Sequence, residues 1–215
     1  MMGILRTGLA AAALCTLGAG GALASTIDFT DVGSYTAGAG SATGTVDGIG
    51  WTLTPSGGSL TYTKYDGTSA PVGSLAFEND GVGIGDDEVD YRSESLTLTF
   101  ASSVLLSGLN FLDLFGFESV RVLADGNFLT EVAATAGALD NSQGGYVAAA
   151  LQAIQVTTLT FMAGPHNDLG PLGFGNPDFA LAGVTVSPVP LPAGGLLLLS
   201  ALGGLVIARR RKTAV

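Results

Sequence analysis

The 215-residue chain has very little cysteine and few basic residues, and both shortages limit what it is. Cys15 is the only cysteine, and it lies in an apolar segment near the N-terminus. A domain formed by the rest of the chain therefore has no disulfide to hold it together. Lysine and arginine number 8 against 18 aspartates and glutamates. Nucleic acid repels so acidic a chain, and we exclude it as a partner.

The few basic residues are concentrated at the two ends. Residues 25–187 hold three of them, Lys64, Arg92 and Arg121, against all 18 carboxylates, which gives this part a net charge of −15. High charge is typical of disorder only when hydrophobicity is low. Apolar residues make up 47% of this chain, and they recur in strand-like patterns. We therefore expect a folded, acidic domain.

Histidine is as scarce as cysteine, and this weighs against catalysis. His166 is the only one, and it lies in a loop bounded by prolines. The sequence has no nucleophile elbow of the form G-x-S-x-G. The glycines at 81, 83 and 85 lack the spacing of a dinucleotide-binding fingerprint. We predict that the domain is not an enzyme.

The first 24 residues have the pattern of a secretory signal peptide. Arg6 provides a positive n-region, residues 9–17 an apolar h-region, and Ala22 and Ala24 an A-x-A cleavage site before Ser25. Such a leader directs the chain to the secretion translocon and is removed by a signal peptidase. We expect an exported protein whose mature chain begins at Ser25.

The C-terminal segment, residues 188–215, has three parts in a fixed order. Pro190 and Pro192 lack an N–H group and hold the chain extended. Residues 193–208 then run without a charge, and as a helix they cover about 24 Å against about 30 Å of hydrocarbon. Four basic residues follow, Arg209, Arg210, Arg211 and Lys212. The positive-inside rule therefore predicts a short transmembrane helix with a cytoplasmic C-terminus.

This three-part segment resembles the VPLPA variant of the PEP-CTERM sorting signal. The motif residues are Val189, Pro190, Leu191, Pro192 and Ala193. Leu191 stands where the commoner form has a glutamate. The resemblance implies recognition by an exosortase, a membrane protease or transpeptidase of Gram-negative bacteria. It also implies that the tail anchors the protein transiently, before the body passes to the cell surface or the exopolysaccharide matrix.

Between these two segments, residues 25–187 are predicted to form one domain of strands. Apolar and polar residues alternate as in strands with one buried face over 26–30, 51–54, 59–63 and 95–100. Further apolar runs cover 104–111, 119–124, 127–132, 154–161 and 179–186. About nine strands separated by turn signals favour an all-β fold, an antiparallel, jelly-roll-like β-sandwich. Residues 133–138 and 146–152 are the only helical candidates, and the second equally continues into the strand at Ile154.

One predicted hairpin has two alternative registers. A two-residue Asp125-Gly126 turn places Val120 opposite Glu131. A three-residue loop that includes Asn127 instead places residues of similar character opposite each other on the two strands, and we predict this register. Its pairs are Val120 with Val132, Val122 with Thr130, and Ala124 with Phe128.

Seven carboxylates lie within residues 78–94, and this is the stretch most suited to binding an ion. Calcium takes six to eight oxygens on a flexible backbone, so candidate ligands are Asp86, Asp87, Glu88 and Asp90. A solvated acidic loop is the alternative, because the order fits neither an EF-hand nor a β-roll repeat. A second candidate calcium site joins Asp28 and Asp178, by analogy with jelly rolls whose first and last strands share an ion.

The aromatic residues add one further expectation. The flat faces of Trp51 and of the tyrosines at 35, 62, 65, 91 and 146 suit stacking on sugar rings. Trp51 alternates within an apolar strand and is predicted to lie in the core, while Tyr62 and Tyr65 near a turn are the better candidates for stacking. We interpret the chain as a non-catalytic structural protein of the cell surface or the exopolysaccharide matrix. A calcium-dependent glycan-binding module is the first alternative, and a polysaccharide hydrolase is the second.

Overall fold

The computed structural model describes residues 23–86, 88–91, 93–137, 139–165 and 177–190. These residues form ten strands and no helix, and every pair of strands is antiparallel. The all-β, antiparallel prediction is therefore confirmed for this part of the chain. The strands are β1 (Ser25–Asp28), β2 (Ala42–Val46), β3 (Ile49–Ser56), β4 (Leu60–Thr61), β5 (Gly83–Ile84), β6 (Ser95–Leu112), β7 (Ser119–Ala124), β8 (Asn127–Ala133), β9 (Val147–Ala163) and β10 (Ala180–Pro188).

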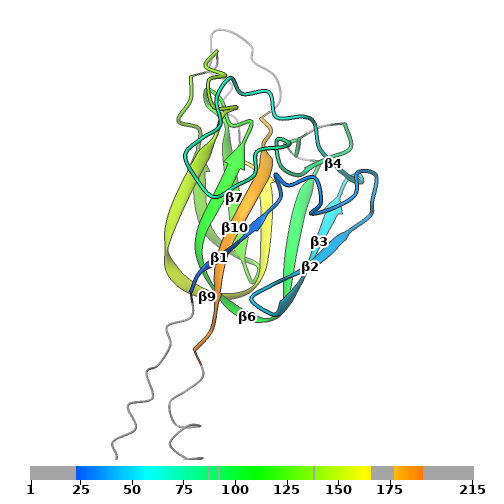
Figure 1. Cartoon of the computed structure of the whole chain (residues 1–215), viewed down its shortest axis with the longest axis vertical. Coiled ribbons are helices and arrows are strands. Elements are labelled where there is room, and N and C mark those ends of the chain that lie inside the picture. The colour runs from blue at the N-terminus through cyan, green and yellow to red at the C-terminus, as the bar shows by residue number, and fades with distance from the viewer. Residues whose placement is uncertain (1–22, 87, 92, 138, 166–176, 191–215) are drawn as a thin grey trace, which may run out of the picture.

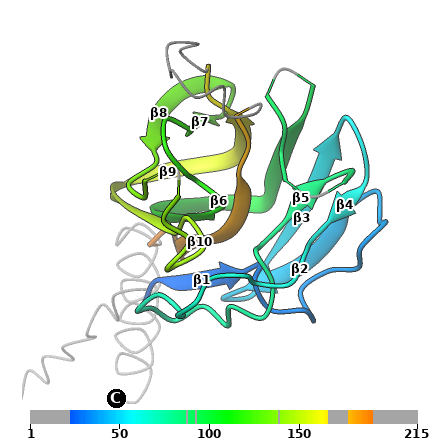
Figure 2. The same ribbon diagram turned by 90° about the horizontal axis from the view of Figure 1, so that it is seen from above.

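Two long strands, β6 and β9, pass through both layers of the fold. They pair with each other from Leu96 opposite Phe161 to Phe111 opposite Val147, and the ladder is interrupted between Thr99 and Val104. At this interruption the ribbon bends back on itself (Figure 1). The first layer contains β2, β3, residues 95–100 of β6, residues 157–163 of β9, β7 and β8. The second layer contains β1, β10 and the other halves of β6 and β9, as Figure 2 shows from above.

A single main core fills the space between the two layers. Phe111 of the second layer packs edge-on against Phe161 of the first, with ring centroids 6.1 Å apart. Both rings are fully buried, and each contributes about 1.5–3 kcal/mol through the apolar surface it removes from water. Trp51 is 7% exposed and packs on Phe29 at 5.6 Å. The prediction of Trp51 as a core residue is confirmed.

Several strands run farther than the sequence pattern predicts. The predicted segments 95–100 and 104–111 both belong to β6, because the strand bends without ending. β9 reaches back to Val147, so the helical alternative for 146–152 is wrong. Pairing with β6 outweighs the helix propensity of its alanines. The helical candidate 133–138 is also not a helix where it is described, since Ala133 ends β8 and Ala136 bridges to Phe115.

Two strands, β2 and β5, are not predicted by the sequence pattern. Each contains a glycine that interrupts the apolar alternation. In β2 this glycine has a packing function. A Cβ at Gly44 would lie 2.4 Å from the Trp51 indole, so the missing side chain makes room for the ring.

The β7–β8 hairpin combines features of both predicted registers. Its opposed pairs are Val120–Val132, Val122–Thr130, Leu123–Phe128 and Ala124–Asn127. The first two pairs are as predicted, whereas the predicted Ala124–Phe128 pair and three-residue loop are wrong. A bulge next to Val122 takes up the one-residue difference. Asp125 and Gly126 then form a two-residue turn with φ of 49° and 79°, as a type I′ turn requires.

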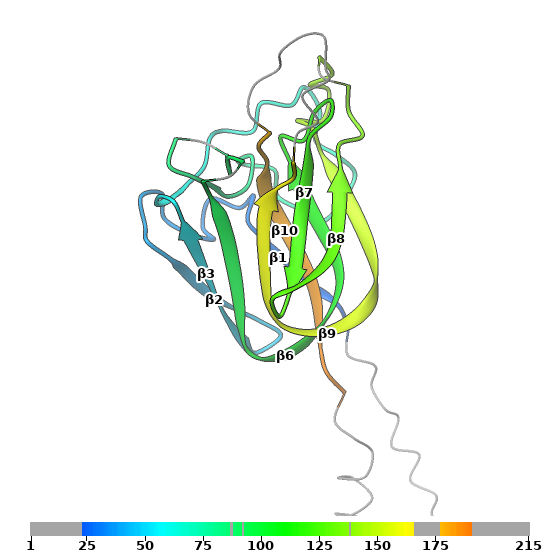
Figure 3. The same ribbon diagram turned by 180° about the vertical axis from the view of Figure 1, so that it is seen from behind.

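The two ends of the sandwich have very different connections. One end, which we call the turn pole, holds the start of β1, the end of β10, the tight turns at 47–48 and 125–126, and the bends of β6 and β9 (Figures 1 and 3). The opposite end, the loop pole, holds the long connections 57–94, 113–118 and 134–146. Paired residues Ser25 and Val186 place both ends of the described body at the turn pole.

Candidate functional site

The acidic segment 78–94 is anchored by its apolar residues. Val82, Ile84 and Val89 are fully buried, and Val82 forms a bridge to Leu181 of β10. A carboxylate of the segment stabilises its own backbone, since Glu94 Oε2 accepts the Asp90 N–H at 2.9 Å. The segment is therefore anchored in the core through Val82, Ile84 and Val89, while Gly85 and Asp86 between them are exposed.

The predicted calcium ligands of this segment do not converge where they are described. Across the described ranges, no three Asp, Glu, His or Cys side chains form a group able to hold an ion. Asp86, Glu88 and Asp90 are thus not gathered around one point, and Asp87 lies outside those ranges. Calcium binding by this segment stays a prediction.

Asp28 has a structural role that the sequence does not reveal. β1 and β10 do lie side by side. The Asp28 Oδ1 atom accepts hydrogen bonds from the Thr30 N–H and hydroxyl at 2.8 and 2.6 Å, and its Oδ2 accepts one from the Ala76 N–H at 2.7 Å. The carboxylate therefore pins the connection 62–82 to the end of β1. An ion shared with Asp178 stays a prediction.

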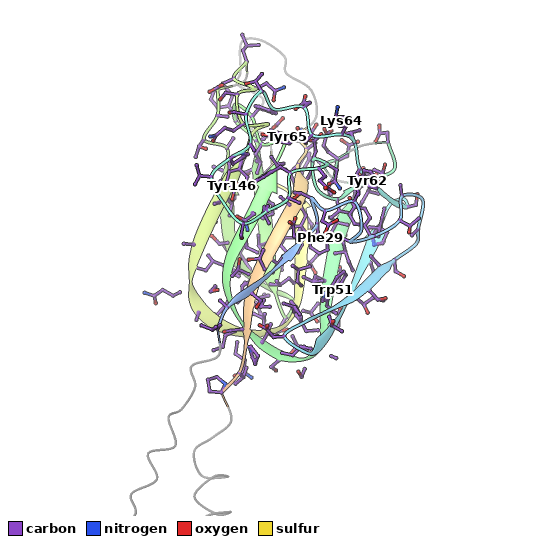
Figure 4. The ribbon with its side chains drawn as sticks, viewed as in Figure 1. Phe29, Trp51, Tyr62, Lys64, Tyr65 and Tyr146 are labelled. Carbon is purple, nitrogen blue, oxygen red and sulfur yellow. The ribbon has the colours of Figure 1, made fainter. Side chains whose placement is uncertain are left out.

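A second hydrophobic cluster lies on the outer face of the second layer. Its buried members are Leu75, Leu112, Ala180 and Ala182. The alanines alternate with the core residue Leu181, so they point away from the main core. Tyr65, Phe77 and Tyr146 pack on this cluster, and the Phe77 ring lies 5.6 Å from each tyrosine ring. The connection 62–82 is thus strapped across the sheet (Figure 4).

Packing accounts for both tyrosines predicted to stack on sugars. Tyr62 contacts the Tyr35 ring at 5.4 Å and the main core. Tyr65 lies in the second cluster, and its hydroxyl donates to the Ser69 carbonyl at 2.7 Å. Burial raises the pKa of Tyr65, and the charge of Asp80 adds to the effect.

A polar hollow of about 160 Å³ opens at the loop pole beside Tyr146. It is lined by Thr135, Ala136, Asp140, Ser142, Gln143, Gly145 and Tyr146. Most of these residues belong to the loop 139–146. The base of this loop is fixed to the end of β6, because the carbonyls of Gly144 and Gly145 accept the N–H groups of Asp113 and Leu114 at 3.0 and 3.2 Å. Gly145 has a φ of 58°, and a Cβ there would lie 2.6 Å from the Leu114 nitrogen. Only glycine fits this position.

The other side of the hollow is held by the connection 62–82. The Ser142 carbonyl accepts hydrogen bonds from the Ser69 N–H and hydroxyl, both at 2.9 Å. The Asn141 side chain donates to the Asp66 carboxylate at 3.0 Å. Two segments far apart in sequence therefore fix the loop in one shape.

Two side chains of the hollow are available to a ligand. Asp140 is fully exposed, and its Oδ1 accepts the Ser142 N–H at 3.1 Å. The Ser142 side chain and N–H lower the pKa of Asp140 through these hydrogen bonds, so the carboxylate is ionised at neutral pH. Gln143 is exposed, and its side chain forms no hydrogen bond with any described residue.

A second, shallower hollow of about 200 Å³ lies on the outer face of the second layer. Small residues of β6, β9 and β10 line it, among them Gly108, Ala148 and Thr185, together with Asn110. The Tyr146 hydroxyl donates to Asn110 Oδ1 at 2.8 Å. Tyr146 therefore links the two hollows, although the sequence favours Tyr62 and Tyr65 over it.

One partly buried carboxyl group at the loop pole, that of Glu118, has a raised pKa. Glu118 Oε2 accepts the Phe115 N–H at 2.7 Å and closes the 113–118 connection. Burial raises the pKa of Glu118 to about 7, opposed by this hydrogen bond, and the charge of Glu88 adds to the rise.

Most of the predicted targeting residues lie outside the described ranges. Val189 and Pro190 directly follow β10, whereas Leu191, Pro192, Ala193, the basic block 209–212 and Ala22 are not described. His166 is not described either. Within the described ranges, no helix has the length and apolarity needed to cross a membrane. The predicted span 193–208 falls beyond them and stays a prediction.

Comparison with known proteins adds little. No family model matches the chain, and no curated protein matches it. Among solved structures, it resembles the carbohydrate-binding module CBM32-3 from a family 31 glycoside hydrolase of Clostridium perfringens, with a TM-score of 0.31 and 13% sequence identity. The likeness covers 61% of this chain and 77% of the module. A similarity at this level carries no argument about function.

Proposed function

We propose that this chain is an exported, non-catalytic structural protein, held briefly in the inner membrane by its C-terminal helix and then passed to the cell surface or the exopolysaccharide matrix. An exosortase-type membrane protease removes the tail after the secretion translocon and signal peptidase have acted. The proposal rests on the two sequence segments that flank the folded body.

One structural observation supports it most strongly. β1 begins at Ser25, the residue after the predicted signal cleavage, and β10 ends at Pro188, the residue before the VPLPA motif. The sandwich thus occupies the stretch between the two predicted segments, and the first two motif residues, Val189 and Pro190, lie outside the sheet. Proline donates no ladder hydrogen bond, so the motif is a poor extension of β10.

The arrangement of the two ends also suits an anchored body. β1 and β10 are paired, and both ends of the body lie at the turn pole. The connections there are two-residue turns and strand bends, so little bulk stands between the sheet and a membrane. The loop pole then faces away from the membrane.

The test is mass spectrometry of the surface-released protein from a Gram-negative host that contains an exosortase-type protease. We expect an N-terminus at Ser25 and a C-terminus near Pro192. The double variant Pro190→Ala, Pro192→Ala should remain in the membrane fraction with its tail. The control Val72→Ala, at a residue 98% exposed on the loop pole, should be processed normally. Released protein that still ends at Val215, or a chain that keeps residues 1–24 in the cytoplasm, would falsify the proposal.

A further inference from the structure

We propose that the hollow beside Tyr146 binds one uncharged sugar ring of a polysaccharide. This is a binding site beyond the structural role argued above, and it does not depend on calcium. The inference comes from the chemistry of the lining, its charge, its rigidity and its place in the fold.

The lining has the groups that a sugar ring requires. Asp140 offers carboxylate acceptors, Gln143 both an acceptor and two donors, and the Thr135 hydroxyl can do either; the Ser142 hydroxyl, which donates to Asp140, can accept. Adjacent hydroxyl groups of a sugar donate and accept in the same way. Tyr146 also borders the hollow, and its ring is held in place by Phe77 at 5.6 Å and by the hydroxyl bond to Asn110. The hollow of about 160 Å³ is smaller than drug-sized pockets of about 300–1,000 Å³, which fits a single ring.

The charge of the site favours a neutral sugar over an acidic one. Asp140 is ionised, and neither of the basic residues that the structure describes, Lys64 and Arg121, lines the hollow. The surrounding domain is strongly acidic. A uronic acid or a sulfated sugar would bring a second negative charge next to Asp140, which repels it.

The site is built before any ligand arrives. Gly144 and Gly145 fix the loop 139–146 to the end of β6, and Ser69 fixes it to the connection 62–82. Tyr146 is fixed through its hydroxyl bond to Asn110. A pre-formed site loses little conformational entropy on binding, so a few hydrogen bonds suffice for measurable affinity.

The surroundings suit a chain rather than a free monosaccharide. Tyr146 connects the hollow to the shallow surface lined by Gly108, Ala148 and Asn110. The small side chains leave room for the neighbouring ring of a polymer. The loop pole is also the end opposite the start of β1 and the end of β10 (Figure 1), so a polymer can reach the site when the body is tethered by its tail.

The experiment is affinity electrophoresis of the full-length chain, in a zwitterionic detergent that carries no sugar headgroup. Native gels contain dextran, galactomannan or hydroxyethylcellulose as neutral polymers, and alginate as the acidic one. We expect the chain to be slowed by at least one neutral polymer and not by alginate. Gln143→Ala and Asp140→Asn should each weaken the effect about tenfold or more, the loss expected from one hydrogen bond to a charged or amide group.

Matched controls separate binding from folding. Gln152→Ala and Asp86→Asn make the same changes at exposed residues that do not line the hollow, and both should migrate like the parent chain. All four variants should keep the parent melting temperature. The proposal is overturned if no neutral polymer slows the chain, if only alginate does, or if the Gln143 and Asp140 variants migrate like their controls. Processing of the tail is measured separately, so failure here leaves the proposed export and sorting untouched.

Discussion

The turn pole and the loop pole belong to the same sandwich, yet they are built by different means. At the turn pole, strands reverse through two-residue turns at Asp47-Gly48 and Asp125-Gly126, all four residues with positive φ, and through bends in β6 and β9. At the loop pole, strands are joined by long segments that brace one another through side-chain contacts. One end is therefore shaped by backbone geometry, and the other by contacts between distant residues.

This difference separates two roles within one domain. The short turns lie beside Ser25 and Pro190 at the two ends of the described body, and this arrangement suits attachment and processing. Long braced loops create hollows lined by varied side chains, which suits recognition. Changes at the tight turns of the turn pole should thus alter stability, while changes at the exposed side chains of the hollow, Asp140 and Gln143, should alter binding and leave stability almost unchanged.

The largest expected effect lies in the core that both poles share. Phe111→Ala removes a fully buried ring that contacts both Phe161 and Phe179. We expect a loss of about 3–5 kcal/mol in the free energy of unfolding. Urea denaturation followed by tryptophan fluorescence measures this, because Trp51 is the only tryptophan and is buried.

The control for this core substitution is Val72→Ala, at a residue 98% exposed on the loop pole. It should change stability by less than about 0.5 kcal/mol. Equal losses for the two variants would mean that the main core does not hold the layers together.

The sharpest comparison of the two poles uses two exposed aspartates. Asp125 Oδ1 accepts the N–H groups of Thr157 and Thr158 at 3.0 and 2.8 Å, and so fastens the β7–β8 turn to the bend of β9. Asp140 Oδ1 accepts the N–H of Ser142 within its own loop. Asp125→Ala should cost about 1–3 kcal/mol, whereas Asp140→Ala should cost less than about 0.5 kcal/mol.

A conservative variant tests the reason for this difference. Asp125→Asn keeps an acceptor oxygen and tolerates a φ of 49°, so it should recover most of the stability in chemical denaturation. If Asp125→Ala proves harmless, or if Asn fails to recover stability, the carboxylate does not fasten the bend.

The same contrast explains how far the sequence predicts the structure. Period-two alternation identifies segments such as 95–100, and Asp125-Gly126 predicts a tight turn, because both signals are local. That 95–100 and 104–111 form one strand cannot be predicted from local signals, because it depends on pairing with β9. The binding hollow is even less predictable, because Ser69 and Asn110 fix the Tyr146 loop from distant parts of the chain. Contacts between residues so far apart leave no periodic pattern in the sequence. The carboxylates of 78–94, in contrast, suggest an ion site in the sequence, yet those that are described do not converge in the fold.

The smallest expected effect concerns the titration of Glu118 at the loop pole. Its pKa is raised to about 7 in the folded state, mainly by burial, against about 4.3 in an unfolded chain. The protonated form is thus favoured by folding. Its stabilising contribution is complete below about pH 4.3 and is lost as the pH rises through about 7.

The variant that isolates this titration is Glu118→Gln, which keeps an acceptor for the Phe115 N–H and removes the charge. Its stability relative to the parent should rise steadily from pH 5 to about pH 7 and then level off, by about 1 kcal/mol in total after allowance for solvent screening of a partly exposed group. Melting temperatures of both proteins from pH 5 to pH 8 measure the difference, in which all other titrating groups cancel. A constant difference across this range would show that burial of Glu118 does not govern its ionisation, and the loop pole would then be more open to solvent than its contacts indicate.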